Sequence, residues 1–168
     1  MIKPEVDLDK ILQEIKVVPE YDRQIMLQGV EGNLDPNYGI GRLEHLKHKE
    51  EQFTVPIFDM PYVNDLMKKL KMFRTRLMRL PPYTCYSYHE DPTPRIHIPL
   101  VTDENCLMII DDMVYRYPAG IWQIADTTLP HTAVNCSPTC QRIHIVGCFD
   151  QSLFDMMEYD ESRVNKQD

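Results

Sequence analysis

The chain has 168 residues, of which 43% are hydrophobic and 26% charged, the composition of an ordinary globular protein. Its 26 acidic residues outnumber its 18 basic ones, and the resulting net charge of −8 disfavours binding to nucleic-acid phosphates. No run approaches the roughly 18 apolar residues of a membrane span, and the charged start lacks the apolar core of a signal peptide. We therefore expect one cytoplasmic domain over 1–168 that binds neither nucleic acid nor membrane.

Two amphipathic helices are predicted in the N-terminal region, about 1–72. Residues 7–17 repeat apolar side chains at helical spacing behind Asp7, a favourable N-cap, and Pro19 ends the pattern. Residues 61–71 begin with Pro61, which suits a first helical turn, and carry lysines near their end. Between the two, residues 23–30 could form a strand.

Two stretches between these helices have alternative interpretations. The segment Gly32–Gly41 is rich in glycine, asparagine and proline, and a loop of this length is either a lid or substrate-binding segment or a surface connection. Residues 43–52 contain His45 and His48, whose spacing would allow metal ligation from one helix face. The charges around these histidines favour a solvated face instead.

From about residue 73 to 150, short strands alternate with turns, which is typical of an all-β unit. The strands are expected at 74–80, 84–89, 95–101, 106–110, 114–117, 121–124, 132–135 and 142–149. This series predicts a mainly β protein with a double-stranded β-helix, the jelly-roll core of cupin-like proteins, flanked by the N-terminal helices. In the short C-terminal segment 151–168, residues 152–159 could form a closing helix.

Cysteine usage does not indicate a disulfide framework, because the five cysteines form an odd set without a CxxC pair. Cys136 and Cys140, with His131 and His144 nearby, allow a zinc site, but no second cysteine pair completes it. Free thiols are the simpler expectation.

The most informative residues are His89, Asp91 and His131. In an extended segment, residues two apart fall on the same side, so His89 and Asp91 can point to one place. His131 follows about forty residues after Asp91. Two histidines and one carboxylate form the facial triad that holds Fe(II) and leaves coordination positions open. Three polar residues near turns would be the alternative.

Two strands repeat an Arg-x-His pattern, with Arg95 and His97 on one strand and Arg142 and His144 on another. In each strand, Arg and His share one face and the isoleucines share the opposite face. The polar faces could be solvated, or they could line the mouth of a barrel, where small ligands bind. Arginine binds carboxylates through two parallel hydrogen bonds, so a pair of arginines beside the triad would suit a dicarboxylate cosubstrate.

Together these motifs resemble the aspartyl/asparaginyl β-hydroxylase-like branch of the iron(II)/2-oxoglutarate oxygenases, which includes hydroxylases of free proline. The motifs that carry the resemblance span about residues 74–150 and run from His89-x-Asp91 through the two Arg-x-His strands. The resemblance implies a double-stranded β-helix with Fe(II) held by His89, Asp91 and His131. It further implies that Arg142 binds the far carboxylate of 2-oxoglutarate.

The resemblance also implies that Arg95 and His97 face the cosubstrate, and that O2 and 2-oxoglutarate are consumed while an amino-acid or peptide substrate is hydroxylated. Trp122 is expected in the core, and His144 is either turned inward or a satisfied core histidine. Tyr83 and the segment Gly32–Gly41 could shape the substrate pocket. The alternative from another functional class is a non-catalytic, cupin-like protein that binds a metal or ligand.

Overall fold

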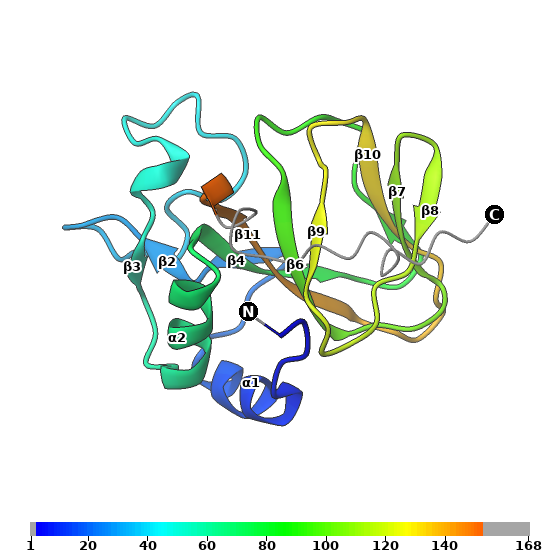
Figure 1. Ribbon diagram of the computed structural model, residues 1–168, viewed down its shortest axis with the longest axis horizontal. Coiled ribbons are helices and arrows are strands. Elements are labelled where there is room, and N and C mark those ends of the chain that lie inside the picture. The colour runs from blue at the N-terminus through cyan, green and yellow to red at the C-terminus, as the bar shows by residue number, and fades with distance from the viewer. Residues whose placement is uncertain (1–2, 153–168) are drawn as a thin grey trace.

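Two antiparallel β-sheets face each other in the computed structural model, which describes residues 3–152 (Figure 1). The larger sheet has five strands, in the order β1 (Gln24–Met26), β4 (Met72–Leu80), β11 (Arg142–Phe149), β6 (Arg95–Val101) and β9 (Gln123–Ala125). The smaller has four, in the order β5 (Thr84–Cys85), β10 (His131–Asn135), β7 (Cys106–Ile110) and β8 (Met113–Tyr115). Non-consecutive strands lie side by side in both sheets, which confirms the expected mainly β, jelly-roll core.

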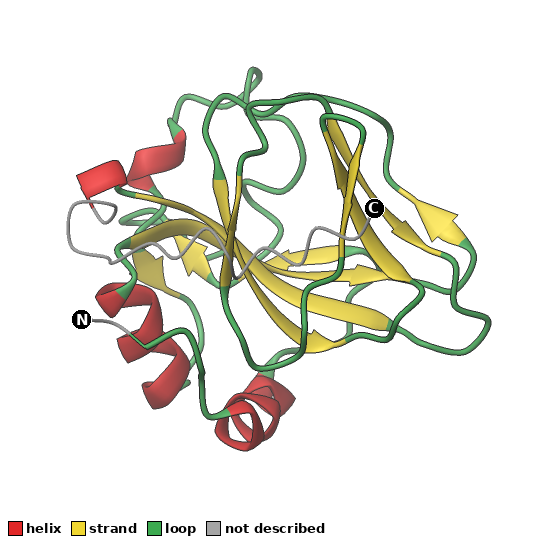
Figure 2. Cartoon of the chain, turned by 45° about the vertical axis from the view of Figure 1, so that its right-hand side comes forward, coloured by secondary structure: helices red, strands yellow, loops and turns green. Residues whose placement is uncertain are grey.

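The two helices α1 (Leu8–Glu14) and α2 (Pro61–Lys69) cover the outer face of the larger sheet (Figure 2). The alternation of β6 explains this layering. Ile96, Ile98 and Leu100 point toward the helices, where they join Trp122 in the main hydrophobic core, as expected for Trp122. The opposite face of β6 points between the two sheets and carries polar side chains.

Both predicted N-terminal helices are present. The Asp7 side chain accepts a hydrogen bond from the Lys10 amide at 3.1 Å, so Asp7 is the N-cap of α1, which continues into the 3-10 turn η1 (Ile15–Val17). Pro61 occupies the first turn of α2. This helix ends two residues before the predicted end, because Lys71 takes a left-handed backbone conformation with φ of 49°.

The N-terminal region also contains strands. Of the predicted strand 23–30, β1 hydrogen-bonds to β4, whereas β2 (Gln28–Gly29) pairs with β3 (Val55–Pro56) in a separate two-stranded sheet. The charged stretch 43–52 is a loop with one 3-10 turn, η2 (Glu50–Gln52). The helical face proposed for His45 and His48 therefore does not form.

Within the β-core, β6, β7 and β11 have the predicted bounds. The largest difference is in 84–89, where only Thr84 and Cys85 pair as a strand, followed by an isolated bridge between His89 and His131. The predicted closing helix at 152–159 lies, after Ser152, outside the described residues. Within residues 3–152, no helix has the length and apolar character needed to cross a membrane.

Candidate active site

His89, Asp91 and His131 converge at one end of the β-sandwich. One ligand atom from each residue lies within 4.8 Å of those of the other two. His131 begins β10, and His89 is placed beside it because the two residues exchange backbone hydrogen bonds of 3.0 and 2.9 Å. The Asp91 amide donates to the carbonyl of Thr127 at 2.8 Å, which fixes the carboxylate next to the imidazoles.

The hydrogen bonds of the two imidazoles determine which nitrogens are available. Nδ1 of His89 lies 2.7 Å from the carbonyl of Ser87, and Nδ1 of His131 lies 3.0 Å from the carbonyl of Leu129. A carbonyl oxygen only accepts, so both Nδ1 atoms carry the proton. Each Nε2 then keeps its lone pair for a metal, the arrangement in which a backbone acceptor orients a histidine ligand.

The protonation state of the site also suits a metal. Burial lowers the pKa of His131, against the smaller opposing effects of the Leu129 carbonyl and the Asp91 carboxylate. The neutral imidazole, which is the metal-binding form, therefore predominates at neutral pH. Nε2 of His131 is 3.7 Å from the nearer Asp91 oxygen.

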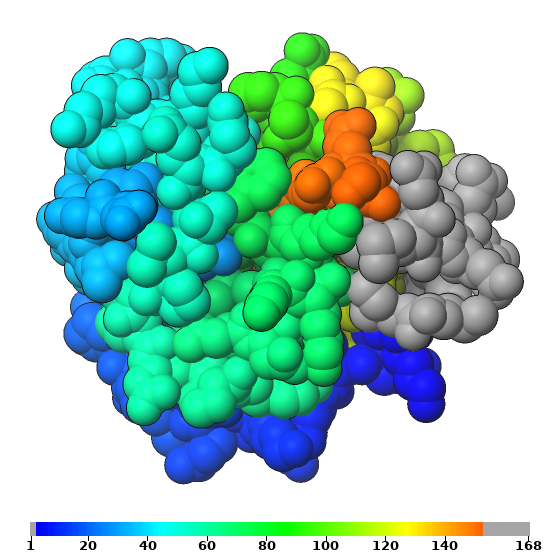
Figure 3. Space-filling view, turned by 60° about the vertical axis from the view of Figure 1, so that its left-hand side comes forward, coloured from blue at the N-terminus to red at the C-terminus, as the bar shows by residue number. Residues whose placement is uncertain are grey.

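These three residues line a cavity of about 680 Å³ between the two sheets. Its inner wall includes His97 and Arg142, so the Arg-x-His faces of β6 and β11 point inward, and the interpretation of a solvated outer face is wrong. Its outer part is lined by residues of the segments 41–44 and 86–92, which stand beside each other as cyan and green atoms in Figure 3. Ligands of small-molecule size fit in a cavity of this volume.

Arg142 is 2% exposed, and within residues 3–152 no carboxylate lies within 4 Å of its guanidinium. Its contact is with the Met108 sulfur, 3.4 Å from Nη2. Burial lowers the pKa of Arg142 to about 10, so the group is still charged at pH 7. An uncompensated buried cation is costly, and a ligand carboxylate would remove that cost.

Arg95 has a different environment from Arg142. Its Nε is 3.3 Å from Asp91 Oδ2, and its Nη2 is 3.0 Å from Glu50 Oε1. Glu50 also pairs with Arg74, whose guanidinium in turn donates to the carbonyls of Gly39 and Gly41. Arg95 lines the cavity, and its side chain also pairs with the carboxylate of a candidate metal ligand, so its expected role toward a cosubstrate stays a prediction.

The Glu50 pairing is a functional feature that the sequence did not reveal, since Glu50 belongs to the stretch interpreted as a solvated face. It also ties the end of the segment Gly32–Gly41 to the cavity wall. Gly39 is required there, because its φ is 103° and a Cβ would lie 2.3 Å from the Phe53 ring. Tyr83, expected to shape the pocket, is 74% exposed, and Tyr86 lines the cavity in its place.

His97 and His144 form a buried pair with their Nδ1 atoms 3.4 Å apart. Burial, followed by the positive charge of Arg142, lowers the pKa of both imidazoles well below the usual value. Both are therefore neutral near pH 7. His97 lines the cavity, whereas Nε2 of His144 is buried without a hydrogen-bond partner.

The sequence profile of the aspartyl/asparaginyl β-hydroxylase family matches residues 7–150. The chain belongs to this family. The match begins well before the motifs that carried the resemblance and takes in both N-terminal helices, so the helical layer is part of the β-hydroxylase family's sequence pattern. No curated protein matches the chain.

Solved structures similar to this β-hydroxylase family member include several cupins. A cupin domain from Bordetella pertussis shares 15% identity over 46% of this chain and 80% of that chain, with a TM-score of 0.40. A predicted oxalate decarboxylase from Thermotoga maritima shares 17% identity over 51% and 73%, with a TM-score of 0.38. A DMSP lyase from Ruegeria pomeroyi shares 14% over 48% and 40%, with a TM-score of 0.38.

The proposed zinc site of Cys136, Cys140, His131 and His144 does not form in this β-hydroxylase family member. His131 lies with His89 and Asp91, whereas Cys140 lies with Asp103 and Cys106 in a second cluster. All five cysteines are free. Burial raises the pKa of Cys140 to about 11, so its thiol is protonated at neutral pH and is a poor metal ligand in that form.

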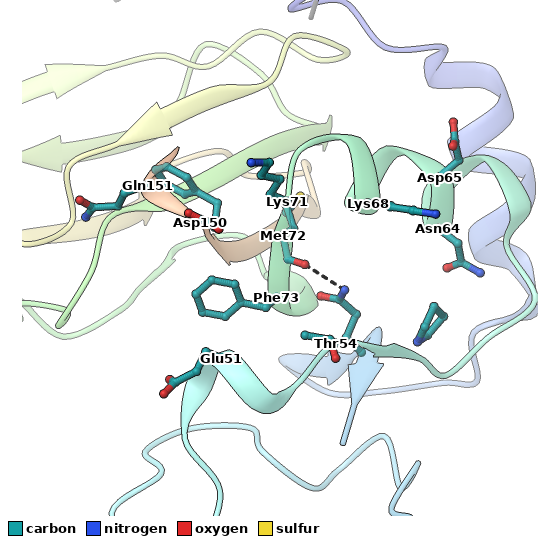
Figure 4. Close-up of a pocket in the computed structure, with 13 residues that line it drawn as sticks. Glu51, Thr54, Asn64, Asp65, Lys68, Lys71, Met72, Phe73, Asp150 and Gln151 are labelled. Atoms are coloured by element: carbon teal, nitrogen blue, oxygen red, sulfur yellow. Dashed lines mark hydrogen bonds between the residues drawn. The ribbon is translucent and has the colours of Figure 1, made fainter. Parts of the chain in front are cut away.

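A second hollow, of about 860 Å³, lies between α2, the start of β4 and the end of β11 (Figure 4). The hydrogen bond from Gln28 Nε2 to the Met72 carbonyl, 3.1 Å long, crosses it. Its carboxylates do not all converge on one point, since Glu51 and Asp65 lie at opposite ends of the view. We therefore assign the chemistry to the cavity that contains His131.

Proposed function

We propose that this chain is an Fe(II)/2-oxoglutarate-dependent dioxygenase that hydroxylates an amino-acid or peptidyl side chain of the aspartate, asparagine or proline type. Succinate and CO2 would be the products formed from 2-oxoglutarate. The proposal rests on one cavity that contains two features. The first is the cluster of His89, Asp91 and His131, and the second is the buried Arg142, which has no carboxylate partner among the described residues. Membership of a hydroxylase family supports it.

The donor set fits Fe(II). His89 and His131 would contribute Nε2, and Asp91 would contribute a carboxylate oxygen, which is the ligand set of non-haem Fe(II) oxygenases. When bound, the metal would supply the activation of O2 and the oxidative decarboxylation of the 2-oxo acid. Arg95 would keep the Asp91 carboxylate in place through their ion pair, because its Nε lies 3.3 Å from one of the two oxygens.

The cavity also fits a dicarboxylate cosubstrate. Arg142 lies on β11, inside the sandwich, and its guanidinium would bind the far carboxylate through charge-assisted hydrogen bonds. His97 lies on the neighbouring strand β6 and lines the same cavity, and its neutral imidazole adds no second positive charge there. The apolar side chains of Met108 and Ala133 would keep water from the bound molecule.

The test is anaerobic addition of Fe(II) and 2-oxoglutarate to the protein. We expect a weak metal-to-ligand charge-transfer band, followed in air by succinate release that a substrate stimulates. His131→Ala and Asp91→Ala should abolish both signals while the circular dichroism spectrum stays unchanged, and His45→Ala, at an exposed loop histidine, should change neither. Metal binding without the band or succinate would instead identify a non-catalytic metal-binding protein.

A further inference from the structure

Arg76 lies on β4, opposite Val146 of β11, and its side chain lines the same cavity as the three candidate ligands. The residue is 9% exposed. Its Nη1 donates to the amide oxygen of Gln24 at 3.2 Å, and its Nε is buried without an acceptor. Because a neutral amide compensates a cation only weakly, Arg76 is a second buried charge that the described residues leave without a carboxylate.

The charges around the cavity are unbalanced. Four buried arginines line it: Arg74, Arg76, Arg95 and Arg142. Among the described lining residues, the carboxylates that are not exposed belong to Glu50 and Asp91, and both are already used by Arg74 or Arg95. Two positive charges therefore remain. Since Fe(II) and the 2-oxoglutarate dianion carry equal and opposite charges, binding of both would leave this excess unchanged.

The cosubstrate cannot satisfy both remaining arginines at its far end. Arg142 pairs in register with Leu80 of β4, four residues from Arg76, so the two lie roughly 13 Å apart along the strand direction. Arg142 contacts Met108 of the smaller sheet, whereas the charges of Arg74, Arg95 and Asp91 act on the Arg76 guanidinium. Arg76 thus lies toward the candidate metal ligand Asp91, away from the site proposed for the far carboxylate of the cosubstrate.

We propose that Arg76 binds a carboxylate of the substrate, so that the substrate is an acid and not a neutral molecule. This inference rests on the proposed hydroxylase function and adds a substrate class to it. The carboxylate belongs either to a free amino acid or to an acidic side chain of a peptide, and both would present the same planar pair of oxygens to the guanidinium. Burial lowers the pKa of Arg76 to about 10, which keeps it charged at pH 7.

The first experiment compares acids with their amides. Succinate release is measured with L-aspartate and L-proline, with the matching amides, and with capped peptides that contain aspartate or asparagine. We expect kcat/KM to fall at least tenfold when the carboxylate is amidated. Free amino acids that react when capped peptides do not would identify the α-carboxylate as the ligand, and the reverse pattern would identify the side chain.

The matched variants are Arg76→Gln and Arg79→Gln. Both are on β4, but Arg79 pairs with Glu20 away from the cavity. Arg76→Gln should bring the ratio of kcat/KM for the acid to kcat/KM for its amide close to one, and Arg79→Gln should leave this ratio unchanged. Amides that react as well as acids, or an unchanged preference in Arg76→Gln, would overturn the proposal.

A second experiment needs neither iron nor turnover, so its failure is separate from that of the proposed function. In Arg142→Met, where the cosubstrate arginine is absent, the tightest-binding of L-aspartate, L-proline and a capped aspartate peptide, at ten times its dissociation constant, should raise the unfolding temperature by about 3–6 °C. The double variant Arg142→Met/Arg76→Met should show no rise. Equal responses of the two proteins, or no response in either, would refute Arg76 as the anion site even if succinate is released.

Discussion

Replacing Glu50 by Gln would test whether the pairing between the loop and the cavity wall holds the site together. The Glu50 carboxylate is 18% exposed and bridges Arg74 and Arg95, whose side chains are 5% and 3% exposed. Removing one member of a buried ion pair costs about 3–5 kcal/mol, because the remaining charge loses its partner. Arg95 keeps Asp91, and Arg74 keeps the carbonyls of Gly39 and Gly41, so we expect the lower limit, about 3 kcal/mol.

For a chain of this size, that loss lowers the unfolding temperature by roughly 6–12 °C. The assay is thermal and urea unfolding of Glu50→Gln beside Glu51→Gln. Glu51 is the neighbouring exposed carboxylate, and its replacement should change the unfolding free energy by less than about 0.5 kcal/mol. If both variants unfold like the original protein, the Glu50 bridge between the two arginines does not stabilise the fold.

Three other changes have defined outcomes. Arg142→Met removes a buried cation without a carboxylate partner among the described residues, so we expect unfolding at an equal or higher urea concentration. Mn(II) should still stabilise this variant, but 2-oxoglutarate added to the Mn(II)-loaded protein should give no further rise in unfolding temperature; a loss of stability in the free variant would contradict this. Gly147→Ala places a methyl group 2.7 Å from Thr75 Oγ1 and should cost about 1–3 kcal/mol in urea unfolding, whereas a neutral effect would show that the neighbouring chain yields. Because burial lowers the pKa of His97 and His144 in the folded protein, the unfolded chain binds more protons than the folded chain below about pH 6.5. The unfolding free energy should therefore fall with acidification by up to about 2.7 kcal/mol per pH unit, with a shallower slope in His144→Gln.

The regular part of the fold could be predicted because local patterns determine it. In β6 and β11, isoleucines alternate with polar residues. The isoleucines pack in the main hydrophobic core, and the polar residues point between the two sheets. Asp7 and Pro61 mark the starts of the helices by capping chemistry that acts within one turn. The His89-x-Asp91 spacing likewise placed two candidate ligands on one side of an extended segment.

Contacts between distant segments could not be predicted in the same way. Glu50 lies in a run of charged residues, and nothing local distinguishes a carboxylate that binds two buried arginines from one in solvent. Arg95 was placed correctly inside the sandwich, but its partner depends on where residue 50 comes to lie. A signal for Arg76 did exist: it follows Arg74 by two residues on a strand, the same spacing as in the two Arg-x-His strands.

We propose that His89, Asp91 and His131 hold one metal ion while Arg142 binds the cosubstrate. A crystal structure of the protein with Mn(II) and 2-oxoglutarate, with anomalous scattering recorded for manganese, tests it most directly. We expect one manganese peak among the Nε2 atoms of His89 and His131 and the Asp91 carboxylate, with a cosubstrate carboxylate on the Arg142 guanidinium. Manganese bound at Asp103, Cys106 and Cys140 instead, or a cosubstrate that does not touch Arg142, would contradict it.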